Sequence, residues 1–512
     1  MAIKKIALIC PHDSFLSYGL RLVSSYLRTN NISTRMIFLP SYTEIWQQYF
    51  HQESSSYYSS KIIEQIRNLV SECDAVGITM MTMDKERVKT LIVALTGLEI
   101  PILLGGVHPT VFPNDAIQLA DHIVIGDGCE ALLEWCREPG RRDIENIWTK
   151  DGAEIYKNPV RPAVDNIDIF SFPDYGPQDH WILYKNKIRP VTKEIIRTFM
   201  GTMYHQFATM GCPFSCTFCV NNRLKKIAKG YGKFHCHSVD YIINEIKYGL
   251  ELSPDIQHIN FPDDGFIALS EDIIEEFSEK YRREIGLPFS VMGIIPAYVT
   301  RRKFDLLVAA GLKRVRVGLQ TANTATLRSY KRAGNSAQYD KCNDLLQSYK
   351  NLVFPYYDII VDNPLVDNEQ DMVDTIEFLV RMKGRFTIVL YSMRMYPGTD
   401  IYDQAKEQKV DEKYFEDSYF QYTNRLLNYI LTVIQCTDIR FLPKLLLLLY
   451  RRTGNIKIPR FLFKFNLLLY MTRCGIEHIR KRDTSGIPRI ILKILSLFIK
   501  DFSNRKTKGK LL

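Results

Sequence analysis

Hydrophobic positions in residues 1–145 fall into short apolar runs separated by amphipathic stretches. The runs with the apolar density of buried strands are Lys5–Ile9, Thr34–Leu39, Ala75–Met80, Ile102–Leu104 and His122–Ile125. Stretches with an apolar residue every three or four positions, which is the helical period, include Tyr18–Arg28 and Ser60–Ser71. This alternation predicts a doubly wound, Rossmann-like parallel sheet, in which a ligand binds at the carboxyl ends of the strands.

Residues 146–195 break this rhythm. They contain the turn signals Asp151-Gly152, Asn158-Pro159 and Phe172-Pro173-Asp174 and show little periodicity. We interpret them as a linker or hairpin region that joins two domains.

The alternation resumes over residues 196–405. The runs typical of strands are Tyr204–Thr209, Ile256–Phe261, Phe289–Ile294, Arg314–Leu319, Tyr356–Val361 and Thr387–Met395. The helical stretches between them are Val239–Leu250, Ile273–Glu284, Arg302–Ala310, Ala337–Lys350 and Glu369–Met382. This succession predicts a partial (β/α)6 barrel, whose chemistry belongs at the carboxyl ends of its strands.

Residues 406–512 have the pattern of helices. Their apolar runs, Phe441–Tyr450, Phe461–Met471 and Ile487–Phe498, are each interrupted by Lys or Arg. None reaches the length of about 18 apolar residues that a transmembrane helix requires, so no span is expected. The chain is therefore predicted to be an α/β protein with four regions, at residues 1–145, 146–195, 196–405 and 406–512.

The net charge of +10 is unevenly distributed. Residues 440–512 hold 18 Lys and Arg against 3 Asp and Glu, so the rest of the chain is slightly acidic. A basic region interleaved with Leu, Ile, Phe and Tyr favours contact with a membrane surface over nucleic acid. The alternative is a helical cap that packs on the barrel and turns its Lys and Arg to solvent.

The cellular compartment is inferred from the N-terminus and the cysteines. The first apolar stretch is too short for a secretion signal and runs directly into Pro11, without a cleavage site. The chain has 11 cysteines, which a reducing compartment would keep as free thiols or metal ligands. We expect a cytoplasmic protein, possessing a metal site rather than disulfides.

The chemistry is carried by residues 210–219, which place Cys212, Cys216 and Cys219 at C-x3-C-x2-C spacing after the first barrel strand. Thiolates are ligands for iron–sulfur clusters or zinc. Three thiolates leave one iron of a cubane cluster open to another ligand, whereas a structural zinc site needs four protein ligands. A zinc site completed by a residue of His235–His237 is the alternative.

This segment resembles the signature of the radical S-adenosylmethionine (SAM) superfamily, with Phe218 at its aromatic position. The resemblance implies that the three cysteines hold a [4Fe–4S] cluster whose open iron binds SAM. It also implies an external electron donor of the flavodoxin or ferredoxin type. Reductive cleavage of SAM would then give a 5′-deoxyadenosyl radical.

Other residues match segments that bind SAM in that family. Asp263 and Asp264 follow the second barrel strand, where relatives bind the SAM amino group. Gln320 lies in a Gly-Leu-Gln-Thr segment similar to one that meets the ribose, and Arg316 or Arg314 is expected to pair with the SAM carboxylate or a substrate acid. The alternatives are solvated acids in a turn and a structural Gln320. No catalytic residue is assigned.

The first half resembles the cobalamin-binding domain that precedes the radical SAM core in one subgroup. The similar segments include Thr79 and the Gly105-Gly106-Val107-His108-Pro109-Thr110 stretch, and glycines at strand ends let a backbone approach a planar ligand. Thr79, Gly105 and Gly106 are therefore expected to bind cobalamin.

The loop after the first strand departs from one cobalamin motif. The pattern D-x-H-x-x-G supplies a histidine to cobalt in some relatives, and here Phe15 stands where that histidine would fall. We interpret His12 and His108 as loop or packing residues. Cobalamin stays an expectation, and a sheet without a cofactor is the alternative.

These observations predict a radical SAM enzyme that acts on a small molecule, depends on cobalamin and transfers a methyl group to carbon. Cyclisation or rearrangement without cobalamin stays open as an outcome. The alternative of another class is a non-enzymatic metal-binding module whose basic region binds a membrane or nucleic acid.

Overall fold

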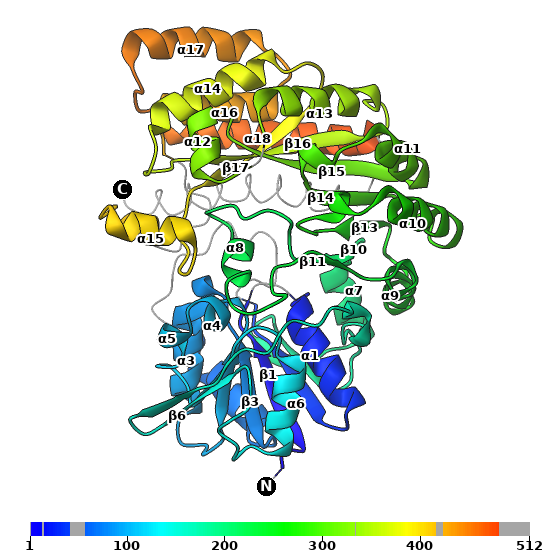
Figure 1. Ribbon diagram of the computed structural model, residues 1–512, viewed down its shortest axis with the longest axis vertical. Coiled ribbons are helices and arrows are strands. Elements are labelled where there is room, and N and C mark those ends of the chain that lie inside the picture. The colour runs from blue at the N-terminus through cyan, green and yellow to red at the C-terminus, as the bar shows by residue number, and fades with distance from the viewer. Residues whose placement is uncertain (1, 13–14, 41–56, 333, 416–422, 481–512) are drawn as a thin grey trace, which may run out of the picture.

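The computed structural model describes residues 2–12, 15–40, 57–332, 334–415 and 423–480 (Figure 1). Two sheets, one from each half of the chain, form the core, and helices follow at the C-terminal end. The predicted α/β architecture is confirmed.

The first sheet has nine strands in the order β7-β6-β5-β4-β3-β1-β2-β8-β9. Its parallel core consists of β1 (Lys5–Cys10), β2 (Ser33–Phe38), β3 (Ala75–Thr79), β4 (Ile102–Gly105) and β5 (His122–Val124). The strand order reverses between β1 and β3, since β1 pairs with both β2 and β3. A reversal of this kind opens a crevice at the carboxyl ends of the two strands.

Helices cover both faces of this sheet. They are α1 (Tyr18–Thr29), α2 (Ser60–Val70), α3 (Lys85–Leu95), α4 (Val107–Val111), α5 (Pro113–Ala116) and α6 (Cys129–Arg137). The apolar side of α2 is buried through Ile62, Ile66 and Val70, the four-residue spacing that places side chains on one helix face.

Residues 146–195, expected as a linker or hairpin region, extend the first sheet at both ends. The hairpin of β6 (Ile147–Asp151) and β7 (Glu154–Lys157) pairs antiparallel with β5, and β8 (His180–Tyr184) pairs with β2 and carries β9 (Lys187–Pro190). Helix α7 (Lys193–Met200) then leads into the second sheet. The domain boundaries at residues 145 and 195 stay a prediction.

The second sheet is a partial barrel of six parallel strands. They are, in spatial and chain order, β10 (Met203–His205), β13 (His258–Phe261), β14 (Phe289–Ile294), β15 (Leu312–Gln320), β16 (Phe354–Val361) and β17 (Thr387–Ser392). The first predicted strand, Tyr204–Thr209, is split. Its end forms β11 (Thr209–Met210), which pairs with β12 (His235–Cys236) in a separate small sheet.

Helices run between these strands and after them. They are α8 (Val220–Leu224), α9 (Val239–Leu252), α10 (Glu271–Glu284), α11 (Arg301–Ala310), α12 (Thr324–Ser329), α13 (Ser336–Ser348), α14 (Asn368–Arg381) and α15 (Asp400–Glu407). Figure 1 shows α8 between the two halves of the molecule.

The C-terminal region is helical, as predicted, over the residues that the structure describes. Helix α16 (Leu426–Cys436) packs on β17 and α14, and α17 (Phe441–Thr453) and α18 (Arg460–Arg480) pack on α16. In the described part of the chain, no helix is both long and apolar enough to cross a membrane. The predicted apolar run Ile487–Phe498 lies outside the described residues.

Candidate functional site

The three predicted cysteine ligands lie on the loop between β11 and α8. Gly211, directly before Cys212, has a φ of 77°, and a Cβ there would lie 1.9 Å from the carbonyl oxygen of Lys233. Only glycine permits this close approach. The loop then turns back on itself, as the backbone N–H of Cys219 donates to the carbonyl of Cys216 over 3.1 Å.

The electrostatics of the thiols show that they are neighbours. Burial raises the pKa of Cys219 to about 12, and the charges of Asp264, Cys216 and Cys212 add to the increase. The pKa of Cys212 is also raised, first by burial and then by Asp264 and Cys216. Thiolates in such a place need a positive partner, which a metal centre provides.

No group of three or more His, Cys, Asp or Glu among the described residues is arranged to hold a single metal ion. The ligands of a cubane cluster bind different iron atoms, so a cluster spaces its thiolates more widely than one tetrahedral ion does. The lack of a single-ion site is therefore compatible with a cluster, and the three cysteine thiols are the donor type that a cluster requires.

Arg332 is a residue of this site that the sequence did not indicate. Its Nη1 lies 3.6 Å from the Sγ of Cys216, and its Nη2 donates to the carbonyl of Gly318 over 2.6 Å. A Cβ at Gly318 would lie 2.5 Å from that Nη2, so a side chain there would displace the guanidinium. Arg332 thus places a positive charge between the cysteine loop and the end of β15.

A cavity of about 830 Å³ lies between the two halves. Its walls are mostly apolar, and they include the ends of β3 and β4 at Thr79, Gly105 and Gly106. The wall from the second half includes Phe207 and Gly211. Because Gly211 precedes Cys212, one cavity extends from the carboxyl edge of the first sheet to the cysteine loop.

Two family models match the two halves that meet at this cavity. The model of the radical SAM superfamily matches residues 207–379, and the model of the B12 binding domain matches residues 4–135. The chain contains a radical SAM domain preceded by a B12-binding domain. This confirms the resemblance that the cysteine spacing and the glycine-rich strand ends indicated.

Curated relatives include two proteins from Chlorobaculum tepidum. The bacteriochlorophyllide d C-8(2)-methyltransferase is 24% identical over 66% of this chain and 70% of its own length. The bacteriochlorophyllide d C-12(1)-methyltransferase is 20% identical, and the match covers 60% of each chain.

Two solved structures share the fold. The cobalamin-dependent SAM radical enzyme OxsB with aqua-cobalamin bound has a TM-score of 0.63 at 14% identity, covering 100% of this chain and 82% of that one. The radical SAM methyltransferase TsrM from Kitasatospora setae, with tryptophan substrate and a SAM analogue bound, has a TM-score of 0.61 at 14% identity. That match covers 79% of this chain and 76% of the TsrM chain.

Within the radical SAM domain, the two predicted acids occupy different positions. Asp263 is buried, and its Oδ1 accepts hydrogen bonds from the backbone N–H and, over 2.7 Å, from the hydroxyl of Thr209. It therefore holds the start of the cysteine loop. Asp264 accepts a hydrogen bond from Asn221 over 2.7 Å and raises the pKa of Cys212 and Cys219, so it is the acid beside the thiols.

The two predicted residues of β15, Arg316 and Gln320, differ in their surroundings. The Nε of Arg316 donates to Asp358 over 2.7 Å, and its guanidinium lies 5.4 Å from the ring centre of Tyr391. Gln320 ends β15 with a φ of 68°, a left-handed conformation that non-glycine residues rarely adopt. Strained backbone of this kind gathers at functional sites.

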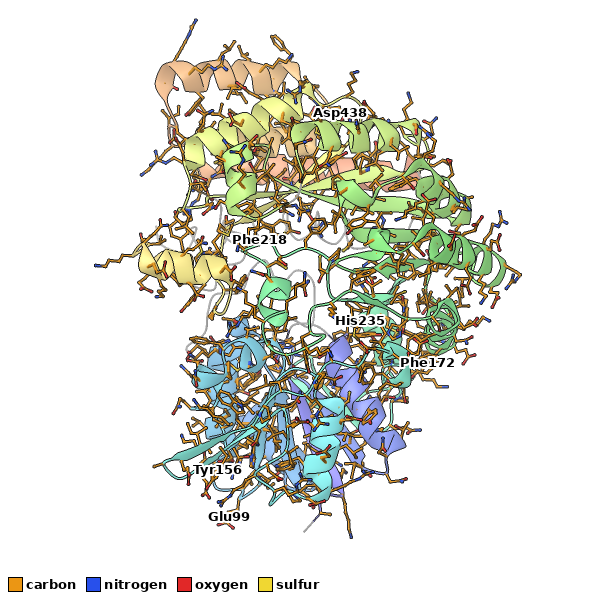
Figure 2. All side chains as sticks on the ribbon, in the orientation of Figure 1. Glu99, Tyr156, Phe172, Phe218, His235 and Asp438 are labelled. Atoms are coloured by element: carbon orange, nitrogen blue, oxygen red, sulfur yellow. The ribbon has the colours of Figure 1, made fainter. Side chains whose placement is uncertain are left out.

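Phe218, the aromatic residue of the radical SAM signature, packs edge-on against Tyr330, with ring centres 5.0 Å apart. It belongs to a small apolar cluster that includes Met393 and Met395. Figure 2 shows Phe218 between the two halves of the molecule. Its contacts join the cysteine loop to the end of the barrel sheet.

In the B12-binding domain, Phe15, which stands at the histidine position of the cobalamin motif, is a core residue. It is buried and packs against Phe38 at 5.0 Å and Phe199 at 5.2 Å between ring centres. His108, interpreted from the sequence as a packing residue, is buried and bonds to Asp115 over 3.0 Å. His12 does line the cavity, and its Nδ1 lies beside the carboxylate of Asp84.

A buried polar network joins the B12-binding domain to the radical SAM domain. Glu245 on α9 is fully buried and accepts hydrogen bonds from Tyr204 over 3.1 Å, from Tyr18 over 3.4 Å and from Gln206 over 3.4 Å. Tyr18 belongs to α1 and also lines the cavity. Burial raises the pKa of Glu245 to about 8, although these hydrogen bonds oppose the increase.

This shift makes stability depend on pH. Between the unfolded value of 4.5 and the folded value of about 8, the folded protein keeps a proton on Glu245 that the unfolded chain releases. Raising the pH therefore favours unfolding, by at most about 1.4 kcal/mol per pH unit. In thermal melts, the melting temperature of the Glu245→Gln variant should fall less between pH 6 and pH 8 than that of the unaltered protein.

The matched control is Glu251→Gln, an exposed acid on the same helix. It should keep the full pH dependence of the unaltered protein. Equal dependence in the Glu245 variant would mean that this carboxyl does not titrate as its burial implies.

Proposed function

We propose that the protein is a cobalamin-dependent radical SAM methyltransferase that acts on a carbon atom of a small-molecule substrate. The single observation that carries this proposal is the cavity that both domains line, from Gly105 and Gly106 to Gly211. A methyl carrier on one wall and a radical source on the other would face the same substrate. The curated relatives named as methyltransferases support methyl transfer as the outcome.

The residues of the cysteine loop fit a cluster and SAM. We assign the cluster to Cys212, Cys216 and Cys219. When bound, the cluster supplies the electron that cleaves SAM to a 5′-deoxyadenosyl radical, and a methylated corrinoid supplies the methyl group. Asp264 would accept hydrogen bonds from the SAM amino group, and Gln320 at the end of β15 would meet the ribose.

The SAM carboxylate is assigned to Arg332 rather than to Arg316. Arg316 forms a direct ion pair with Asp358, whereas Arg332, which feels the charge of Asp358 without a direct bond to it, is hydrogen-bonded to Cys216 and Gly318. An arginine held by a backbone carbonyl is fixed in place, so little freedom is lost when an anion binds.

Replacing this arginine should weaken SAM binding. Arg332→Met removes a charge-assisted hydrogen bond worth about 1.5–3 kcal/mol, which is about 10- to 150-fold in Kd. Equilibrium binding of SAM to the anaerobically reconstituted protein measures the change. Arg328→Met, at an exposed site on α12, should bind SAM normally. Normal binding by the Arg332 variant would reject the assignment.

The corrinoid is assigned to the B12-binding half of the cavity. A Cβ at Gly106 would lie 2.9 Å from the carbonyl oxygen of Met80, so a side chain would disturb this strand end. Glycine at two successive positions leaves the edge open to a flat ligand. The apolar walls would keep water away from the reacting carbon and so prevent side reactions of a radical.

The function is tested by anaerobic reconstitution of the full chain. About four iron and four sulfide per chain, with cleavage of SAM to methionine and 5′-deoxyadenosine upon reduction, are expected. The ultraviolet–visible spectrum of protein from cobalamin-fed cells should show bound corrinoid. Tightly bound zinc without SAM cleavage would refute the enzyme, and protein free of corrinoid would refute the role of the first domain.

We also propose an acidic external electron donor of the flavodoxin or ferredoxin type. Residues 223–233, which follow the cysteine loop, hold five Lys and Arg and no acid. Opposite charge would steer such a carrier to the cluster. Reduction by flavodoxin should therefore slow as salt is added, whereas a small chemical reductant should be less sensitive.

A membrane surface is the second partner that we propose, through the basic C-terminal region. The excess of 18 Lys and Arg over 3 acids in residues 440–512 supports an anionic surface.

A further inference from the structure

Helix α18 buries both apolar and polar side chains, including Phe463, Met471, Asn466, Arg473 and Glu477, and it exposes a second set of apolar side chains to solvent. Phe461, Phe465, Leu469, Ile476 and Ile479 are all exposed. Their spacing of four, four, seven and three residues puts them on one face of the helix. Phe461 is 66% exposed and Ile479 is 62% exposed, which is unusual for side chains of this size.

The inward side of α18 is anchored by hydrogen bonds and ion pairs. Asn466 donates to the hydroxyl of Thr432 over 2.8 Å. Arg473 donates to the carbonyl of Gln435 over 2.9 Å and pairs with Asp438. Glu477 pairs with Arg385 from the segment before β17.

Buried polar groups of this kind are costly to leave unpaired, so these contacts fix the helix in one rotation. The apolar stripe is consequently held outward. The exposed stripe is therefore present whenever α18 is packed in its native orientation.

Helix α17 also exposes apolar side chains. Pro443 and Leu447 are its buried residues, while Phe441, Leu445 and Leu448 are exposed at helical spacing. Phe441 is 73% exposed. Exposed apolar residues on two successive helices exceed the scattered single residues that need no explanation.

Positive charge surrounds these stripes. Residues 439–480 contain nine Lys and Arg, of which Arg473 faces inward and Arg480 pairs with Glu477, the one acid of this range. Lys444, Arg460 and Lys464 are exposed on the two helices. Arg451 is paired with Glu377 over 2.6 Å. The face therefore combines apolar side chains with charge of one sign.

We propose that the outward faces of α17 and α18 bind an anionic lipid surface, with the helices lying along it and their apolar stripes inserted below the headgroups. The inference deepens the membrane contact proposed above and does not depend on the cofactors. A second copy of the chain would bring the same positive charge to the same face, and nucleic acid would leave the Phe, Leu and Ile side chains in water. Lipid satisfies both the charge and the apolar stripe.

The test is sedimentation of the full chain with vesicles. Vesicles of phosphatidylglycerol and phosphatidylcholine in equal parts should carry the protein down, and phosphatidylcholine alone should not. The double variant Phe461→Ser with Phe465→Ser should lower the vesicle-bound to free ratio at least tenfold. Lys444→Glu with Lys464→Glu should lower binding and its sensitivity to salt.

The matched control is Val93→Ser with Leu352→Ser, two exposed apolar residues far along the chain from these helices. It should bind vesicles as the unaltered chain does. Equal binding to neutral vesicles, or no binding to either kind, would overturn the proposal. If light scattering shows a dimer that becomes a monomer in the Phe461 and Phe465 variant, the face would be assigned to a second copy instead.

Loss of vesicle binding leaves iron content and SAM cleavage as independent measurements. A variant that no longer binds lipid but retains both would separate the membrane contact from the proposed chemistry.

Discussion

Replacement of any one of Cys212, Cys216 and Cys219 by alanine should abolish reductive cleavage of SAM and remove most of the bound iron and sulfide. Each thiolate would hold one corner of the cluster, and two remaining ligands leave two irons open to water and oxygen. Burial and mutual repulsion already raise the pKa of Cys212 and Cys219, so neither thiolate is stable there without a metal centre. Iron and sulfide analysis, absorbance near 400 nm and detection of 5′-deoxyadenosine measure the loss.

Cys236→Ser separates this interpretation from the zinc alternative. Cys236 lies on β12 beside β11, and its thiol contacts the carbonyl of His237 over 2.9 Å. If three cysteines hold a cluster, this variant should retain iron and SAM cleavage. Loss of tightly bound zinc in this variant, with no iron in the unaltered protein, would show that the loop is a structural zinc site.

The second large effect is expected from Gly105→Leu, which should block the corrinoid half of the cavity. Gly105 follows Leu103 by two residues on β4, so a side chain there points to the same face of the sheet, and both residues line the cavity. A Cβ would meet only Val124, at 3.8 Å, so the backbone tolerates the change. The rest of the leucine side chain would occupy ligand space.

Overpacking of this kind costs about 1–3 kcal/mol, so corrinoid affinity should fall by about 5- to 150-fold. Titration with cobalamin, followed by the visible spectrum, measures the affinity. Iron content should not change, because the cysteine loop belongs to the other wall. Gly140→Leu, at an exposed turn where a Cβ meets nothing within 4 Å, is the control. Unaltered affinity in the Gly105 variant would place the corrinoid elsewhere.

Local sequence patterns predicted most of the two sheets. A strand such as β1 is buried along nearly its whole length, so its sequence is a continuous apolar run, and α2 shows its buried face as a four-residue repeat. The split of the predicted strand Tyr204–Thr209 into β10 and β11 was not predicted. Nothing in its apolar pattern records that the chain leaves the large sheet to carry the cysteine loop.

The site residues also divide into those that short-range sequence indicates and those that only the fold brings together. Cys212, Cys216 and Cys219 could be predicted as ligands because their spacing within one loop is itself the chemical signal. Arg332 was missed because its contact with Cys216 joins residues 116 positions apart. Asp263 was expected to contact SAM from its place after a strand, and this stays a prediction. The bond of its Oδ1 to Thr209 is another contact that depends on folding.

By itself, the sequence determined the α/β architecture, the cysteine loop and the resemblance of each half to its family, since these depend on short-range periodicity and spacing. Only the tertiary structure decided which side chains meet across the chain. It joined Gly105, Gly106 and Gly211 along one cavity and brought Tyr18 to Glu245. It also left one apolar stripe of α18 outward, while Phe463 and Met471 pack inward beside the paired Arg473 and Glu477.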